Sequence, residues 1–569
     1  MSEQIVDLIE ALPQPGPRGL QGERGPQGLP GVNAVPADEA VASYLSAVDS
    51  KSHAAVDALL PVLLRDVVIQ RDNTSLMVPR RRVYLNCTFD RDYPDEQMKS
   101  ADDMVFVNCR FFKPAGRLWT MSGRDERKGL ARATFVNCTF KGSYSSGNDD
   151  FRNHQIVFDQ FAGLSFTNCG FRDVGVRVQA SGETGRLVGT LTMSGCRFER
   201  TAWDVYRTIG DETSADFSHK EFVSVPSKYL CCVSDCVFDG ANSRWDSLDL
   251  YNCWGANVSD TRFYAGDQAT CCEVKSIYDG ASSGTWGNET NITGGQVQVT
   301  FSDCWFVGGE DAANWIGVGA ITYYRNGYDP GAESRYTGKR VYLDRCLLWG
   351  RGGSMAAARG TNVVMRDCKV DKVAAAPNRL VTLEADDRND MDTLVRLDRC
   401  EGSIAWRTWP SASRTRLEAC DCVLYLIVID DSITFNNVSF NRCRFNPGKR
   451  VMDSSYGCYS GAAGTIVMRD CEYTSFRLAK GSLTATGCRM DSLGVWDSMR
   501  LEHCHTRDVN TGAIAGRVEY RDLTYTDGTP DKTKLTPINI KEVTMAKSIG
   551  GGLSLLVFAA SHHDWRLAA

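Results

Sequence analysis

Short runs of alternating apolar and polar residues recur along most of the chain, and most of these runs lead into a cysteine. In "LSFTNCGF", Leu164 and Phe166 alternate with polar residues, so both point to one face of a strand. Asn168 tolerates the bent backbone of a corner, which turns Cys169 and Phe171 to that same face. The pattern predicts a short strand, a one-residue corner and a second short strand.

This unit is repeated, because a single copy could not bury its apolar face. Successive cysteines are mostly ~16 to 32 residues apart, the range of units that stack as the coils of a solenoid. A leucine-rich repeat would need a Leu/Asn consensus and a propeller a longer, four-strand period, and neither is present. We assign these cysteines to the position after the corner: Cys87, Cys109, Cys138, Cys169, Cys196, Cys236, Cys253, Cys304, Cys346, Cys368, Cys400, Cys420, Cys443, Cys471, Cys488 and Cys504.

Copies such as "VFVNCRF" and "TFVNCTF" resemble the coils of the pectate-lyase-like superfamily. The resemblance spans roughly residues 82–525. It implies an all-β fold, a right-handed, single-stranded parallel β-helix, which we place at residues 67–526. A fold of this kind says nothing about chemistry by itself.

The cysteines are expected to be reduced and buried. Cysteine packs as a small hydrophobe, and thiols stacked on neighbouring coils would lie ~4.8 Å apart, which exceeds the ~3.8 Å Cβ separation of a disulfide. The alternative is a ladder of disulfides. No C-x-x-C pair is present to suggest a zinc ribbon or a thioredoxin-like site.

The stretch "GPRGLQGERGPQGLPGVN" places a glycine at every third position from Gly16 to Gly31. Collagen triplets fold only as three intertwined chains, because glycine alone fits the crowded axis. We therefore expect a trimeric neck, and the alternative is a disordered Pro/Gly linker at residues 13–36. Apolar residues at helical spacing precede and follow the triplets, for example Ile5 and Leu8, and later Val41 and Leu45.

The order of the parts resembles that of phage tail fibres and minor tail proteins: a leader helix, collagen triplets, the helical segment "VPADEAVASYL" and a long β-helix. The resemblance implies a homotrimer that binds phage tail or baseplate proteins through its N-terminus and a bacterial surface polysaccharide through its distal part. It also implies a place at the tail tip of the virion after folding in the host cytoplasm. The expected parts are an N-terminal attachment helix at 1–14, a collagen-like segment at 15–33, a helical neck at 34–66, the β-helix at 67–526 and a C-terminal cap or tip at 527–569.

Other partners are not expected. The net charge is −6 and the basic residues are dispersed, so we expect no nucleic-acid partner. The N-terminus "MSEQIVDLIEALPQ" lacks the basic and apolar regions of a secretory signal, and "SIGGGLSLLVFAA" is too short for a membrane span, so we expect no membrane insertion. No cofactor motif is present.

Where the number of residues between successive cysteines increases, long loops must leave the coil. These loops are rich in aromatic, amide and glycine residues. Aromatic faces stack on sugar rings while amides bond hydroxyls, so these loops are typical of a glycan surface. The alternative is that the aromatics cover the coil or line a trimer seam. Trp245, Trp254 and Trp305 lie in or beside coil motifs and are expected to be structural. The expected glycan contacts are Trp203, Tyr206, Trp286, Asn288, Tyr323, Tyr324, Tyr328 and Tyr336.

A tailspike depolymerase, either a glycoside hydrolase or a polysaccharide lyase, is the rival function. Neighbouring coils can place two carboxyl groups at the ~5 to 5.5 Å separation of retaining hydrolysis. Asp246, Asp249 and Glu384 are the candidate catalytic residues, although outward acidic pairs often serve only solvation. A third class, a collagen-like bacterial adhesin, is disfavoured because no signal peptide or anchor motif is present.

We expect no metal site, and the weak candidates are His503 and His505 in "EHCHT". These flank an inward Cys504, and in a trimer the histidines of the three chains could bind a metal ion on the threefold axis. Two exposed histidines on a late coil are the simpler interpretation.

Overall fold

The structure of the chain is a computed structural model. It contains a stack of strands between residues 63 and 538. The described residues are 63–69, 83–90, 98–99, 103–112, 119–122, 124–125, 129–142, 155–159, 161–179, 188–199, 203–205, 228–239, 247–251, 255–264, 271–278, 298–307, 318–324, 340–349, 354–358, 362–370, 379–385, 393–408, 415–429, 434–445, 463–473, 477–511 and 514–538. The expected leader helix, the collagen-like segment, nearly all of the helical neck and most of the C-terminal tip lie outside them. No described residue belongs to a helix with the length and hydropathy of a membrane span.

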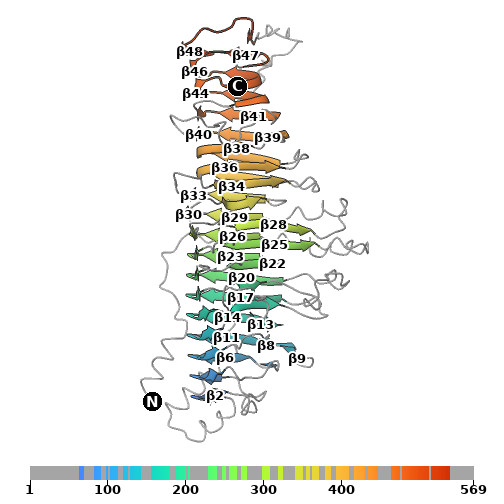
Figure 1. Cartoon of the computed structure of the whole chain (residues 1–569), viewed down its shortest axis with the longest axis vertical. Helices are drawn as coiled ribbons and strands as arrows, with labels where there is room; N and C mark the ends of the chain where they lie inside the picture. The colour runs from blue at the N-terminus through green and yellow to red at the C-terminus, as the bar shows by residue number, and fades with distance from the viewer. Residues whose placement is uncertain are drawn as a thin grey trace, which may run out of the picture.

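The strands stack in three rows to form a long solenoid (Figure 1). The first row is a 19-stranded parallel sheet. It consists of β1 (Leu63–Arg65), β3 (Val83–Leu85), β6 (Met104–Val107), β11 (Arg132–Val136), β14 (Gly163–Thr167), β17 (Val188–Ser194), β20 (Lys228–Ser234), β23 (Gly255–Ser259), β26 (Gln298–Ser302), β29 (Arg340–Asp344), β32 (Asn362–Arg366), β35 (Thr393–Asp398), β37 (Thr415–Cys420), β39 (Thr434–Asn441), β41 (Ala463–Arg469), β43 (Arg477–Thr486), β45 (Val495–Glu502), β47 (Val518–Arg521) and β49 (Leu535–Pro537).

The second and third rows together make a 28-stranded sheet, because β36 pairs with strands of both rows. The second row consists of β2 (Val68–Ile69), β4 (Thr88–Phe89), β7 (Arg110–Phe112), β12 (Thr139–Lys141), β15 (Gly170–Arg172), β18 (Arg197–Glu199), β21 (Val237–Asp239), β24 (Arg262–Tyr264), β27 (Trp305–Val307), β30 (Leu347–Trp349), β33 (Lys369–Val370), β36 (Glu401–Thr408), β38 (Val423–Ile429), β40 (Arg444–Phe445), β42 (Glu472–Tyr473), β44 (Arg489–Ser492), β46 (His505–Asp508) and β48 (Thr524–Asp527). The third row consists of β5 (Met98–Lys99), β8 (Trp119–Ser122), β13 (Gln155–Asp159), β16 (Gly175–Gln179), β19 (Trp203–Val205), β22 (Leu248–Tyr251), β25 (Cys272–Tyr278), β28 (Val318–Tyr324), β31 (Ser354–Ala358) and β34 (Arg379–Ala385).

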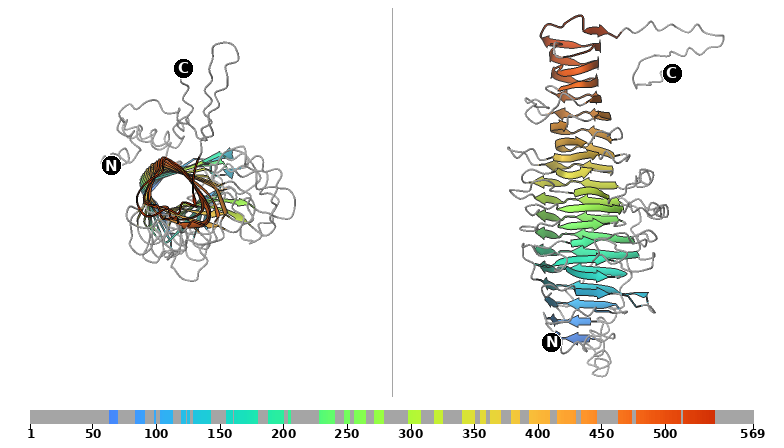
Figure 2. Two further views of the ribbon diagram at one scale, coloured as in Figure 1. Left: turned by 90° about the horizontal axis from the view of Figure 1, so that it is seen from above. Right: turned by 45° about the vertical axis from the view of Figure 1, so that its right-hand side comes forward.

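The predicted all-β fold with stacked parallel strands is therefore confirmed for the described residues. The pairings within the three rows are parallel, and a small antiparallel pair, β9 (Arg124–Asp125) with β10 (Gly129–Leu130), stands apart from them. Seen along its axis, the solenoid shows successive coils lying over one another (Figure 2). The strands extend beyond the expected range of 67–526 at both ends, to β1 and β49.

A single residue in the left-handed region forms the corner between each first-row strand and the second-row strand that follows it. The φ angles at these corners lie between 50° and 68°. Asn, Asp and Gly tolerate this conformation best, and they fill most of the corners. The corner residues are Asp66, Asn86, Asn108, Asn137, Asn168, Gly195, Asp235, Asp260, Asp303, Arg345, Asp367, Arg399, Asp421, Arg442, Asp470, Gly487, His503 and Asp522.

The residue after each corner turns into the core, as the sequence pattern predicts, and in most coils it is a buried cysteine. The thiol donates to backbone carbonyls: the Sγ of Cys109 lies 3.4 Å from the oxygens of both Val107 and Tyr84, the latter in the preceding coil. All cysteines of the described part of the chain are free thiols. Burial raises the pKa of the Cys138 and Cys346 thiols, so these side chains stay protonated and unreactive.

Two of the cysteine assignments need correction. Thr261, not Cys253, follows the corner at Asp260, and its hydroxyl donates to the Ser259 carbonyl at 2.7 Å, as a thiol does elsewhere. Cys422, not Cys420, follows the corner at Asp421 and is buried. In both cases the left-handed residue defines the corner, and the side chain after it is in most coils small and able to donate a hydrogen bond, although Val67 and Leu523 take this position in the first and last coils.

Two columns of aromatic side chains run through part of the interior. The second-row column stacks aromatic rings from Phe89 to Phe306, with ring centroids 4.5 to 5.4 Å apart between neighbouring coils. A first-row column runs from Tyr84 to Phe166 at 4.7 to 4.8 Å and meets the other column edge to face. Such pairs contribute about 0.5–1.5 kcal/mol each beyond the burial of their area.

Gly402 occupies the position two residues after Cys400, where other coils place a stacked apolar side chain. The strand register shifts on both sides of this point, next to Arg379 and to Gly402 itself. A Cβ added at Gly402 would collide with Val370 Cγ2 and lie 2.8 Å from Leu380 Cγ. Leu380 therefore fills the space that a larger residue would take.

We predict that Gly402→Ala lowers the stability of the coil, by about 1–3 kcal/mol, because the core here is already filled. The matched control is Gly170→Ala, since a Cβ at Gly170 meets nothing within 4 Å. Urea unfolding followed by far-ultraviolet circular dichroism checks the difference. Equal midpoints for the two variants would contradict the described packing.

Candidate functional site

The outer face of the second row carries an exposed aromatic and apolar surface, which we call the tryptophan patch. It lies on β24, β27 and β30, three neighbouring strands of the stack. The side chains that alternate with it, Phe263, Phe306 and Leu348, are buried, so the patch takes the outward positions. Its members are Arg262, Tyr264, Trp305, Val307, Leu347 and Trp349.

Two large rings dominate the patch. The Trp305 side chain is 43% exposed and that of Trp349 is 54% exposed, which is unusual for the largest apolar residue. The Arg262 guanidinium carbon lies 5.1 Å from the centroid of the Trp305 ring, an arrangement in which the cation is attracted to the π system. This contact holds Trp305 against the coil and leaves ring surface open to solvent.

The register of the strands explains why the two tryptophans form one surface. Trp305 pairs with Arg262 on one side and Leu347 on the other, while Val307 pairs with Trp349. The Cα atoms of Trp305 and Trp349 are therefore one strand spacing apart and two residues along, on the order of 8 Å. Rings at this spacing can stack on sugar rings of one oligosaccharide.

Trp305 was expected to be structural, and its contact with Arg262 agrees with that, although its ring is partly exposed. The residue directly after the corner cysteine is not part of the core in any coil where its burial is described, as Arg110 and Arg197 also illustrate. This rule is readable from the sequence once the corner is located. Trp245 and Trp254 lie outside the described residues.

A second feature lies on the third row, where the backbone register aligns acidic residues. Asp204 of β19 pairs with Asp249 of β22, and Asp249 pairs with Glu273 of β25. Asp249 lies between Leu248 and Leu250, which are both buried. Neighbouring strands are ~4.8 Å apart, which sets the spacing of these three residues along the row. We call these three residues the acidic column.

The other two catalytic candidates do not join this column. Asp246 lies outside the described residues. Glu384 lies on β34 and pairs with Arg407 of β36. In the order of the third row, β25, β28 and β31 stand between β22 and β34, a separation of about 19 Å between Asp249 and Glu384. The structure thus separates two residues that sequence reasoning treated as equivalent candidates.

The predicted glycan contacts are placed only in part. Tyr323 and Tyr324 end β28 and pair with Ile277 and Tyr278 of β25. These two strands reach beyond their neighbours, as Figure 1 shows. Trp203 takes a register position between Val176 and Leu248, which both belong to the core. The remaining predicted contacts lie outside the described residues: Tyr206, Trp286, Asn288, Tyr328 and Tyr336.

The two histidines are exposed and have partners on the next coil. His503 Nδ1 lies 3.0 Å from Asp522 Oδ2, and His505 Nδ1 lies 2.9 Å from Thr524 Oγ1. Within the described ranges, neither histidine belongs to a group of three metal-ligating side chains.

A group with ligand atoms within 4.8 Å of one another lies elsewhere, at Asp398, Cys420 and Asp421. Its carboxylates already bind arginines: Arg399 Nη1 lies 2.7 Å from Asp398 and Arg442 Nη2 lies 2.6 Å from Asp421. The arginines supply the positive charge that a cation would otherwise bring.

Comparison with known proteins adds no further constraint, since the chain matches no protein-family model, no curated protein and no solved structure.

Proposed function

We propose that this chain is a homotrimeric attachment fibre of the phage tail-fibre kind, whose solenoid presents the tryptophan patch to a polysaccharide on a bacterial surface. The observation that carries the proposal is the pair of exposed rings, Trp305 and Trp349, on an otherwise regular coil. Flat aromatic faces next to hydrogen-bonding groups are the usual means of binding sugars. In this proposal the N-terminal part binds tail or baseplate proteins.

The solenoid suits a fibre because its strength does not depend on long-range contacts. Each coil bonds only to its neighbours, so a long and stiff shaft is built by repetition. The free thiols of the core agree with assembly in a reducing cytoplasm. The collagen triplets in the sequence favour three chains per fibre.

We predict that Trp305→Ala and Trp349→Ala each weaken glycan binding about tenfold or more, which is ~1.4 kcal/mol, because a stacking surface is lost. The probes are purified envelope polysaccharides from a panel of bacteria, screened on an array with the full chain, followed by equilibrium binding to those retained. The matched control is Tyr525→Ala, since Tyr525 is 49% exposed on the same row but far from the patch. Undiminished binding by both tryptophan variants would refute the patch as the binding surface.

A depolymerase on the same scaffold is the second candidate, and the acidic column favours it. In this function one carboxyl group of the column acts as general acid and a neighbouring carboxylate as nucleophile or base. Arg177 of β16 pairs in register with Asp204 at one end of the column, so a basic residue adjoins the acidic ones along the row.

If the chain cleaves glycan, Asp204→Asn or Asp249→Asn should reduce the release of new reducing ends, or of unsaturated ends in a lyase, by a factor of 10² or more. Glu384→Gln is the matched control, since it lies about four strands away and should leave release unchanged. Full activity in both aspartate variants would exclude the acidic column. Binding without product in the unmodified chain would leave the attachment function alone.

A further inference from the structure

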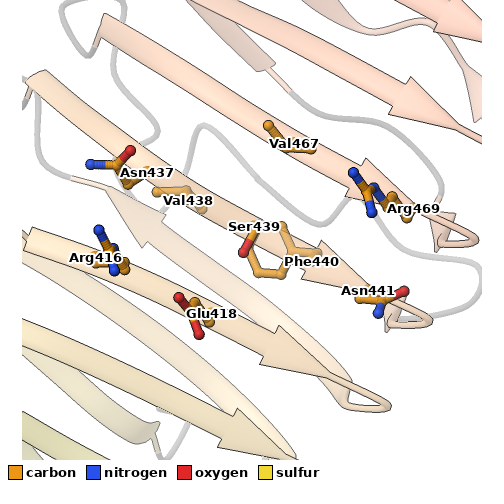
Figure 3. A pocket seen from close by; sticks show the side chains of 9 residues that line it. All are labelled: Arg416, Glu418, Asn437, Val438, Ser439, Phe440, Asn441, Val467 and Arg469. Carbon is orange, nitrogen blue, oxygen red and sulfur yellow. The ribbon is translucent and has the colours of Figure 1, made fainter. Parts of the chain in front are cut away.

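The outer face of the first row has a hollow that the proposed function does not use. It lies over β37, β39 and β41 and encloses about 440 Å³. Figure 3 shows its side chains on three successive strands, with Arg416 and Glu418 on one side and Arg469 on the other. We call it the arginine groove, and its lining residues are Arg416, Glu418, Asn437, Val438, Ser439, Phe440, Asn441, Val467 and Arg469.

A β-bulge lies next to the groove and changes the local pairing. The register of β39 against β41 shifts between Phe435 and Val438, where β39 has one more residue than its partner. Asn437 sits in this bulge with a φ of 68°, in the left-handed region that asparagine tolerates. Bulges bend a strand locally and re-aim side chains, and backbone strain of this kind concentrates at functional sites.

The charged side chains that line the groove differ in whether they form ion pairs. Glu418 is bound by Arg396 of the preceding coil, with Nη2 2.6 Å from its Oε2. Arg416 and Arg469, in contrast, have no ion pair or side-chain hydrogen bond among the residues described. The nearby corner arginines Arg399 and Arg442 are both paired with aspartates. The groove therefore presents two free guanidinium groups in a chain of net charge −6.

The spacing of the two arginines suits an extended ligand. Arg469 pairs in register with Asn441, while Leu417, the residue after Arg416, pairs with Val438. The two arginine Cα atoms are thus two strand spacings across and four residues along, roughly 16 Å apart. Asn437, Ser439 and Asn441 lie between them and offer amide and hydroxyl groups.

We infer that the arginine groove binds an acidic oligosaccharide, with an anionic group at each arginine and sugar hydroxyls on the amides and the serine between them. Guanidinium groups recognise carboxylate or phosphate by paired hydrogen bonds, and both chemistries occur in charged glycans. Local charge rather than net charge drives this binding, because charges beyond about 10 Å are screened at ordinary ionic strength. The groove is separate from the tryptophan patch, and the inference rests on the proposed function only in taking a glycan as the ligand.

The test is direct binding to the full chain of three defined probes: an oligogalacturonate, a glycerol-phosphate oligomer and a neutral dextran oligomer. We expect the acidic probes to bind and the neutral probe not to bind, with affinity falling as salt rises. The acidic probe that binds better tells whether carboxylate or phosphate is the group recognised. Equal binding of all three probes, or none by any, would overturn the inference.

Variants then locate the site. Arg416→Ala and Arg469→Ala should each weaken binding of the acidic probe at least tenfold, and Arg416→Lys should restore only part of it because lysine lacks the paired donors. The control is Arg444→Ala, an exposed arginine on the second row. Binding that is lost in Trp305→Ala but kept in Arg416→Ala would place the glycan at the tryptophan patch and refute the groove, while the reverse result would support the groove as a site of its own.

Discussion

The left-handed corner followed by a small buried hydrogen-bond donor is the constraint on which the rest of the coil depends. The chain must change direction between two rows while each coil keeps its hydrogen bonds to the next, and one residue with a φ of 50° to 68° achieves this. In most coils the residue inside the corner is small, and Val67 and Leu523 replace it in the first and last coils. Cysteine fits it and also bonds the carbonyls at the end of the strand, as Cys109 does with Val107 and Tyr84. The stacked aromatic rings follow, because the corner brings the same position of each coil into the same column.

The corner also leaves the outer face free to vary. In the second row, the first and third residues after the thiol face outward, and the coil accepts arginine, glycine or tryptophan there. The corner side chains themselves form a column outside, where Arg345, Arg399 and Arg442 each bind an aspartate with two nitrogens. Arg442 lowers the pKa of Asp421 to about 2 in this way. Such exposed pairs add little stability, so they offset only part of the cost of about 1–2 kcal/mol for a left-handed arginine.

The repeat could be predicted from the sequence because the corner leaves a local signature: alternation, a turn residue, a cysteine and an apolar residue. The prediction failed where the signature was incomplete: Thr261 replaces the cysteine after one corner, and Cys420 lies just before the true corner residue Asp421, which Cys422 follows. The tryptophan patch was missed because Trp305 lies inside the motif, although its position after the cysteine is an outward one. The acidic column could not be predicted, because the turn between the second and third rows varies in length. Asp204 lies eight residues after its corner cysteine and Asp249 thirteen after its own, so only the strand register aligns them. The arginine groove lies next to a bulge at Asn437, and no residue spacing in the sequence predicts that bulge.

The reduced thiols that follow the left-handed corners lie inside the coil, and differential alkylation can test this. The chain, purified without reductant, is alkylated first in the folded state and then, with a second reagent, in guanidinium chloride, and each site is identified by mass spectrometry. We expect exposed Cys232 to react in the folded state and corner cysteines such as Cys138 and Cys346 to react only after unfolding. Corner cysteines that react in the folded state, or that resist both reagents because they form disulfides, would contradict it.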